Sequence, residues 1–345
     1  MEYSQLTKIF LLTSLGFILA LGLTPIFTNF LYKNKLGKQI RQDLKTPNFS
    51  KLHRAKEGTP TMGGVLVWGT LLVLILLFWL LGELLQIESL EKFNFLTRKE
   101  TLLPLGALIG ASLVGLLDDW LDIKKRGHNG RGLRFRFKLI LYALVAVIGA
   151  WWFFSKLEFS QVYLPFAGNI DLGFWYIPFF ILAVVSTSFA VNETDGLDGL
   201  AGGTLLIAFF SYGIIAFTQG KYDLASFIGV ICGALLAFLW FNVYPARFFM
   251  GDTGSMGLGV LLAIVAFLTN SVFLLALIGF VFMAEAGSLL LQIFWRKAFK
   301  KKLLLSSPVH HHFEVLGWPE TKVTMRFWII AAVMSIFGVI IYFIG

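Results

Sequence analysis

Charged residues are scarce in this chain of 345 residues, because Asp, Glu, Lys and Arg together make up only 14% of it, against about 25% in ordinary soluble domains. Hydrophobic residues make up 57%. This balance excludes an ordinary soluble protein and indicates an integral membrane protein. The net charge of +9 does not indicate nucleic-acid binding, because the basic residues flank apolar segments, where anionic lipid and the positive-inside bias account for them.

Other absences limit the architecture. Cys232 is the sole cysteine, which excludes an intrachain disulfide and leaves the redox compartment open. The sequence has no internal repeat of about 20–50 residues and no low-complexity linker. Its apolar segments also leave no room for a separate soluble domain, so we predict one membrane domain over residues 1–345.

Apolar runs long enough to cross a bilayer, at about 20 residues each, recur along the chain. Backbone polar groups in lipid have to be satisfied within the chain, so such runs predict a helical bundle. Residues 256–295 contain one charge, Glu285, and are too long for one crossing; two helices that turn near 270–271 fit better. The predicted fold is all-α, with about ten transmembrane helices over residues 9–32, 62–82, 101–117, 139–155, 172–191, 200–220, 224–244, 254–269, 272–295 and 327–345.

Lysine and arginine are concentrated on one side of this arrangement. The tracts 33–61, 118–138 and 296–326 contain eight, seven and seven of the 29 lysines and arginines. The positive-inside bias places these tracts in the cytoplasm. Ten spans then put both termini on the opposite, periplasmic side.

Five polar or acidic clusters fall in gaps between the spans, and all five gaps open toward the predicted cytoplasmic side. A membrane-embedded active site that faces one compartment is the simplest explanation. The clusters are residues 56–64, 118–119, 192–199, 251–254 and 308–320.

Acidic residues in three of these clusters suit a cation. Asp118 and Asp119 are adjacent carboxylates that repel each other unless they share a cation or a proton, and hard oxygen ligands suit Mg²⁺; a solvated helix end is the alternative. After Asn192, the carboxylates recur among glycines, so residues 192–199 can hold a metal, a phosphate or a polar ring, although Asp and Gly are also common in turns. Asp252 lies between glycines at the start of a span and suits a metal ligand or a helix N-cap equally well.

Histidines and a lysine offer partners for an anionic substrate. His310, His311 and His312 suit either a transition metal or the recognition of a phosphate or sugar, and no cysteine or second histidine pair nearby completes a zinc site. Lys56 precedes a glycine-rich entry into the second span and is placed to neutralise phosphate, although small residues there also serve tight helix packing.

Two further features have both a functional and an ordinary explanation. A basic cluster before the fourth span suits an anionic lipid headgroup, but the positive-inside bias explains it equally well. Glu285 is the one charge deep in a span, which makes it a functional candidate; the alternatives are a break in the ninth helix and a hydrogen bond to a neighbour. The basic cluster comprises Arg131, Arg134, Arg136 and Lys138.

Taken together, the motifs resemble those of the phospho-N-acetylmuramoyl-pentapeptide-transferase family, bacterial enzymes of peptidoglycan synthesis. The resemblance covers nearly the whole chain. The last block is the most specific, because wider relatives that transfer other sugar phosphates share the aspartates but have a different histidine segment. The blocks read GTPTMGG (58–64), DD (118–119), NETDGLDGLA (192–201), WFNVYPARFFMGDTGS (240–255) and PVHHHFEVLGWPE (308–320).

The resemblance implies transfer of phospho-N-acetylmuramoyl-pentapeptide from its UDP-linked form to undecaprenyl phosphate, with Mg²⁺ as cofactor and lipid I and UMP as products. It implies an enzyme of the bacterial cytoplasmic membrane with its active site facing the cytoplasm, and a homodimer. By the same resemblance, Asp252 is the principal Mg²⁺ ligand, Asp119 supports the metal, and Asp118 deprotonates or orients the lipid phosphate. The nucleotide region is lined by Asn192, Asp195 and Asp198, with Asn242 nearby. The diphosphate or sugar is contacted by Lys56, Thr61, His310, His311 and His312.

Two residues and one loop depart from the family pattern. The loop between the third and fourth spans, which contains His128, Asn129 and Gly130, is slightly longer than in relatives. Glu193 occupies a position that is usually apolar, and Asp122 stands where relatives commonly have lysine. The alternatives are transfer of another hexosamine phosphate, against which the 308–320 block argues, and ion or metal transport. A transporter gathers its acids near the bilayer midplane, where only Glu285 is predicted to lie.

Overall fold

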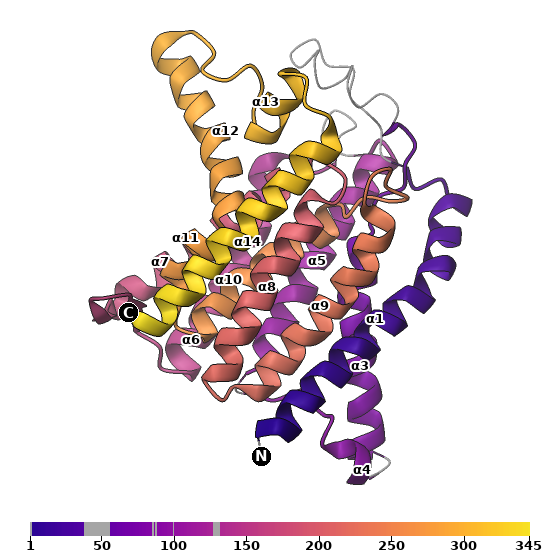
Figure 1. Ribbon diagram of the computed structural model, residues 1–345, viewed down its shortest axis with the longest axis vertical. Coiled ribbons are helices and arrows are strands. Elements are labelled where there is room, and N and C mark those ends of the chain that lie inside the picture. The colour runs from indigo at the N-terminus through magenta and orange to yellow at the C-terminus, as the bar shows by residue number, and fades with distance from the viewer. Residues whose placement is uncertain (1, 38–55, 85, 87, 99, 127–131) are drawn as a thin grey trace.

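A computed structural model describes residues 2–37, 56–84, 86, 88–98, 100–126 and 132–345 of the protein. It is a bundle of long helices (Figure 1). Within these ranges, eight helices are long and apolar enough to cross a membrane, and a ninth span is counted if one bent helix pair is included. The prediction of a polytopic helical membrane protein is therefore confirmed.

The helices follow the predicted apolar runs closely. In chain order, the helices up to the middle of the chain are α1 (Glu2–Lys33), α3 (Gly64–Trp79), the π-helical turn η2 (Leu80–Leu84), α4 (Glu88–Glu91), α5 (Leu102–Ile123), α6 (Phe135–Lys156) and α7 (Tyr176–Thr194). They are followed by α8 (Leu200–Thr218), α9 (Tyr222–Asn242), α10 (Asp252–Leu268), α11 (Leu275–Ile278), α12 (Phe280–Phe299), α13 (Val309–Val315) and α14 (Glu320–Ile344). Short 3₁₀ turns, η4 (Gly173–Trp175) and η5 (Val272–Leu274), precede α7 and α11.

The all-α prediction needs one correction. Strands β1 (Gln161–Leu164) and β2 (Gly168–Asp171) form an antiparallel hairpin between α6 and α7, with Gln161 opposite Asp171. The hairpin is joined to the end of α10, because the Tyr163 amide donates to the Asn270 side chain at 3.0 Å. Four-residue strands outside the long apolar runs give too short an alternating pattern to be recognised.

The predicted span over 272–295 is not one straight helix. Its two parts, Val272–Ile278 and Phe280–Phe299, meet at an angle of 84°. The break falls at Gly279, whose amide donates to the Leu275 carbonyl at 2.8 Å, and a glycine tolerates such a sharp change of direction. As a result, α12 projects beyond the rest of the bundle, beside α13 (Figure 1).

Helix α10 lies at the centre of the bundle and positions the site. Every residue of α10 after Asp252 is buried, and the helix packs against α3, α5 and α7. The approach is close because small residues meet: a Cβ on Gly64 would lie 2.1 Å from the Gly254 Cα, and a Cβ on Gly115 would lie 2.4 Å from the Asp252 carbonyl oxygen. Such small-residue contacts are typical of helix packing in membranes.

Candidate active site

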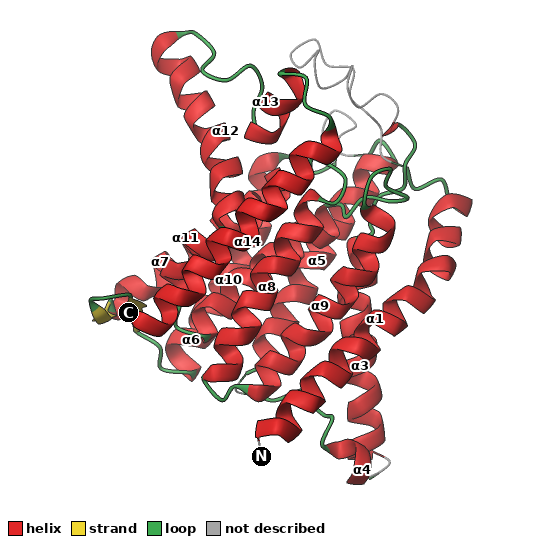
Figure 2. Cartoon of the chain, viewed as in Figure 1, coloured by secondary structure: helices red, strands yellow, loops and turns green. Residues whose placement is uncertain are grey.

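The predicted clusters gather at one end of the bundle. Loops that follow α1, α5, α7 and α9 lie together at the end where α13 is found, and both chain termini lie toward the other end (Figure 2). The clustering that the sequence pattern predicted is therefore present among the described residues.

Backbone pairing joins the glycine-rich segment to the loop before α10. The Phe249 amide donates to the Pro60 carbonyl, and the Gly63 amide donates to the Phe249 carbonyl, each at 2.8 Å. This pairing brings Thr61 against Gly251, where a Cβ would lie 2.7 Å from the Thr61 hydroxyl oxygen. Gly251 has a φ of +73°, so both its conformation and its surroundings favour glycine.

Asp118 and Asp252 share one cation, the ammonium of Lys138. Lys138 Nζ lies 2.9 Å from Asp118 Oδ2 and forms a short ion pair with Asp252 Oδ2. Asp118 also accepts a hydrogen bond from the Leu133 amide at 2.7 Å. Two carboxylates separated by 134 positions are thus held together by a positive charge, which relieves their mutual repulsion.

Asn192 completes the surroundings of Asp252. Its side-chain amide donates to Asp252 Oδ1 at 2.8 Å and to the Ser255 hydroxyl at 2.9 Å. The end of α7 is thereby fixed to the beginning of α10. Glu193 is half-buried beside it and interacts electrostatically with His310, Asp252 and Lys138.

Asp119 has a different set of partners from its neighbour. Its two carboxylate oxygens accept hydrogen bonds from the amides of Asp252 and Thr253, each at 3.1 Å. These amides are among the unpaired donors of a helix N-terminus, where a carboxylate is stabilising. In this structure, Asp119 caps α10, whereas Asp118 faces the ammonium.

Lys56, Asp198 and Glu320 form a second ionic cluster. Lys56 Nζ lies 2.6 Å from Asp198 Oδ1 and forms a short ion pair with Glu320. Asp198 also accepts a hydrogen bond from the Ala246 amide at 2.9 Å, and its own amide donates to Glu320 at 2.6 Å. The cluster joins the segments after α7 and α9 to the start of α14.

Asn242 and Asp195 lie at helix ends. Asn242 accepts from the Gly199 amide at 3.0 Å and donates to the Phe248 carbonyl at 2.8 Å, so it fixes the backbone on both sides of the site. Asp195 follows the end of α7, and its amide donates to the Asn192 carbonyl at 3.1 Å.

The three histidines have three environments. His310 is fully buried, and its Nδ1 lies 2.9 Å from Glu285; His311 Nδ1 lies 2.6 Å from Glu314. His312 Nδ1 accepts a hydrogen bond from the Leu305 amide at 3.2 Å. The expected alternative for Glu285, a hydrogen bond to a neighbour, is therefore observed.

The basic cluster around the start of α6 divides in the structure. Lys138 lies among the aspartates, whereas Arg134 and Arg136 are exposed; Arg131, like residues 128–130 before it, lies outside the described residues. Glu320 and Ser255 were not predicted as site residues, although both lie in the motif blocks 308–320 and 240–255. A glutamate directly after Pro319, at the start of a helix, was the available signal.

The donor set fits Mg²⁺ better than a transition metal. No group of three or more His, Cys, Asp or Glu side chains suited to a metal occurs among the residues that the structure describes. Mg²⁺ is commonly held by one or two carboxylates together with substrate phosphates and water. Asp118 and Asp252, which already share a cation, provide such a pair.

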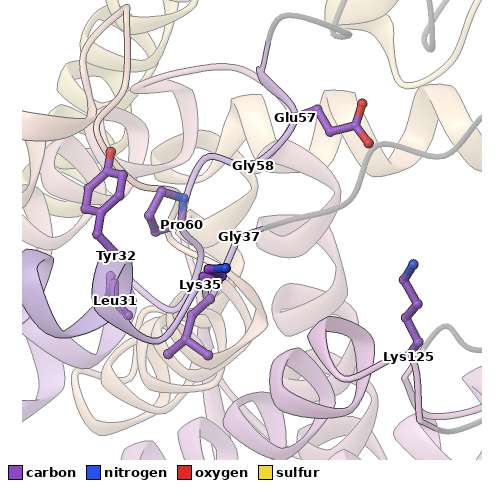
Figure 3. Close-up of a pocket in the computed structure, with 9 residues that line it drawn as sticks. Leu31, Tyr32, Lys35, Gly37, Glu57, Gly58, Pro60 and Lys125 are labelled. Carbon is purple, nitrogen blue, oxygen red and sulfur yellow. The ribbon is translucent and has the colours of Figure 1, made fainter.

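A cavity of about 510 Å³ lies beside the glycine-rich segment. Its lining includes Tyr32 from the last turn of α1, Lys35 just after α1, Glu57 and Pro60 from the motif loop, and Lys125 just after α5 (Figure 3). It adjoins the loop that carries Thr61 but is lined by none of the aspartates described above.

Comparisons with known proteins indicate the class to which the chain is similar. Residues 101–270 match the model of glycosyl transferase family 4, and residues 56–66 match signature 1 of phospho-N-acetylmuramoyl-pentapeptide-transferase. With its membrane-spanning helices, the chain is therefore similar to membrane-embedded glycosyl transferases.

Curated relatives identify the family within that class. The chain is 37% identical to a phospho-N-acetylmuramoyl-pentapeptide-transferase of Chloroflexus aggregans, over 97% of this chain and 89% of the relative. It is 39% identical to that of Geobacillus sp. (strain WCH70), over 95% of each chain, and 38% identical to that of Anoxybacillus flavithermus, over 97% and 98%. The chain belongs to the phospho-N-acetylmuramoyl-pentapeptide-transferase family of enzymes.

Proposed function

We propose that the protein transfers phospho-N-acetylmuramoyl-pentapeptide from UDP-N-acetylmuramoyl-pentapeptide to undecaprenyl phosphate, forming lipid I and UMP. The observation that carries the proposal is the meeting of Asp118, Asp252 and Lys138 at the start of α10. Family membership supports the choice of substrates.

The reaction requires charge neutralisation and positioning. An oxygen of the lipid phosphate attacks the β-phosphorus of the donor, the bond to the UMP oxygen breaks, and UMP leaves with that electron pair. Both reactants are anionic, so cations and fixed hydrogen-bond donors lower the barrier more than a strong nucleophile does. Asp118 orients or deprotonates the lipid phosphate, and Lys138 offsets negative charge beside it.

Asp252 is the principal candidate to hold Mg²⁺, with support from Asp119 through the backbone that it caps. When bound, Mg²⁺ neutralises the diphosphate. Asn192 keeps Asp252 in place through its 2.8 Å hydrogen bond. Asp252 supplies hard oxygen atoms of the kind that this ion prefers, and the carboxylate of Asp118, which shares the Lys138 ammonium with it, adds negative charge nearby.

The remaining candidates bind the donor in this proposal. Asn192, Asp195 and Asp198 line the nucleotide region, and Asn242 holds that region's backbone. The diphosphate and sugar are contacted by Lys56, Thr61, His310, His311 and His312. Their arrangement at one end of the bundle supports this assignment.

The proposed site faces the cytoplasm of a bacterium, with the protein in the inner membrane and both termini periplasmic. This orientation rests on the concentration of Lys and Arg in the same loops that carry the site. Family membership also supports a homodimer.

The experiment that tests the proposal follows the sugar into lipid. Purified protein is incubated with UDP-N-acetylmuramoyl-pentapeptide labelled in the sugar, undecaprenyl phosphate and Mg²⁺, and the butanol-extractable label is measured. We expect label in the lipid phase only when undecaprenyl phosphate is present. Folded protein that leaves all the label in the aqueous phase would contradict the proposal.

A further inference from the structure

Glu285 and His310 form a buried pair that is separate from the group of Asp118, Asp252 and Lys138. Glu285 lies on α12 and His310 on α13, and both side chains are 0% exposed. His310 Nδ1 lies 2.9 Å from Glu285 Oε2, and the His310 amide donates to the same oxygen at 3.4 Å. The carboxyl group therefore fixes the orientation of the imidazole ring.

The other ring nitrogen faces a segment of the proposed nucleotide region. His310 Nε2 is a buried atom with no hydrogen-bond partner among the described residues. A Cβ on Gly196 would lie 2.3 Å from it, so Nε2 is directed at residues 192–199. A buried polar atom without a partner calls for an explanation, and a ligand that supplies the partner is one.

Electrostatics decides whether Nε2 donates or accepts. In a low-dielectric interior, an acid–base pair is least costly without net charge. The two neutral combinations are a carboxylate with an imidazolium, and a protonated carboxyl group that donates to Nδ1 of a neutral imidazole. In both combinations, Nε2 carries a hydrogen. His310 therefore presents an N–H donor to residues 192–199.

We propose that Glu285 is a positioning residue, which holds His310 so that Nε2–H donates to an oxygen of the bound UDP-linked donor. The inference rests on the proposed function and extends it to a residue of α12 that touches no substrate itself. Gly196 lies against Nε2 in this structure, so the proposed contact requires the backbone around Gly196 to shift when the donor binds.

The test measures donor affinity and turnover in the full-length, detergent-solubilised protein. Calorimetry with UDP-N-acetylmuramoyl-pentapeptide gives Kd, and steady-state assays give KM for the donor and for undecaprenyl phosphate. We expect Glu285→Ala to raise Kd and KM for the donor about tenfold, because one hydrogen bond to a charged group is lost. KM for the lipid phosphate is expected to stay unchanged.

Two variants serve as controls. Glu285→Gln retains a hydrogen bond to Nδ1 and is expected to restore most of the donor affinity. Ser335→Ala removes another buried hydrogen bond, from the Ser335 hydroxyl to the Ile278 carbonyl at 3.1 Å, and is expected to leave both KM values unchanged. Equal losses of affinity in Glu285→Ala and Ser335→Ala would overturn the inference.

Substitutions of His310 distinguish the roles of its two ring nitrogens in donor binding. They test the inference even if Glu285→Ala does not fold. His310→Gln places an amide near the position of Nε2, and His310→Asn places one near that of Nδ1. We expect His310→Gln to bind the donor more tightly than His310→Asn, and the reverse order would overturn the inference. Wild-type protein that binds no donor would overturn the proposed function as well, whereas normal wild-type binding matched by Glu285→Ala would overturn this inference alone.

Discussion

The carboxylate of Asp119 accepts a hydrogen bond from the backbone amide of Asp252 at 3.1 Å. Two motifs that lie 133 positions apart are thereby joined through a helix N-terminus. The neighbouring Asp118 points instead to the ammonium of Lys138. Adjacent aspartates therefore have different tasks, one in placing the backbone of α10 and one beside the shared cation.

This difference predicts different effects of Asp119→Asn and Asp118→Asn. Asparagine keeps one acceptor oxygen but loses the second acceptor and the negative charge at the N-terminus of α10, a charge that is worth about 1 kcal/mol. Asp119→Asn should therefore lower the melting temperature and turnover while the Mg²⁺ concentration for half-maximal activity stays the same. Asp118→Asn should raise that Mg²⁺ concentration, because a negative charge next to the ion is lost. Titration of activity with Mg²⁺ checks both variants. A raised Mg²⁺ requirement in Asp119→Asn together with an unchanged one in Asp118→Asn would contradict the account.

Asp252→Asn should abolish turnover while the protein stays folded. The substitution retains the shape of the side chain but removes the charge that Lys138 and Mg²⁺ require. Turnover and thermal unfolding measured on the same preparation check this. An active Asp252→Asn enzyme would refute the assignment of Asp252 as the metal ligand.

Lys138→Met should lower both the stability of the protein and its turnover. It leaves two carboxylates, the buried one of Asp118 and the partly buried one of Asp252, without their cation. Removing one partner of a fully buried ion pair costs about 3–5 kcal/mol, which is the upper limit of the loss of stability expected here. We expect a lower melting temperature in the absence of Mg²⁺, partial recovery of stability when Mg²⁺ is added, and a turnover at least tenfold below wild type.

Lys156→Met is the matched control for that substitution. Lys156 lies at the other end of α6 and is exposed, so its replacement should change neither turnover nor Mg²⁺ dependence. If Lys138→Met behaved like Lys156→Met, the ammonium would have no part in holding the two carboxylates.

Gly196→Ala should disturb the donor site without a change of charge. A Cβ there would lie 2.3 Å from His310 Nε2, which forces the ring or the loop to move. We expect at least a tenfold rise in the donor Kd. Gly106→Ala adds the same methyl group where no atom lies within 4 Å, and should leave Kd unchanged; equal Kd values for the two variants would show that the contact at Gly196 has no role.

The sequence predicted the features that depend on composition and local pattern. Apolar runs located the helices, because length and hydrophobicity alone decide whether a segment can cross a bilayer. The turn near residues 270–271 followed from the same reasoning, and the structure has a break there between α10 and η5. The gathering of the motif loops at one end followed from counting the spans.

Contacts between distant segments could not be predicted from composition and local sequence pattern. Lys138 looked like one member of a basic cluster, and only the fold places it 2.9 Å from Asp118. Likewise, neither the cap that Asp119 provides nor the partnership of Glu285 with His310 leaves a periodic signal. The bend at Gly279 was missed because a glycine in an apolar run is also compatible with a continuous membrane helix.

The most direct test of the central claim is UMP release by the purified protein with undecaprenyl phosphate and Mg²⁺. UDP-N-acetylmuramoyl-pentapeptide is compared with UDP-N-acetylglucosamine, each with and without a chelator. We predict release with the first donor alone, and its loss when the chelator is added. Release with the second donor alone would contradict the assigned sugar, and release from neither donor by folded protein would contradict the proposed transferase reaction.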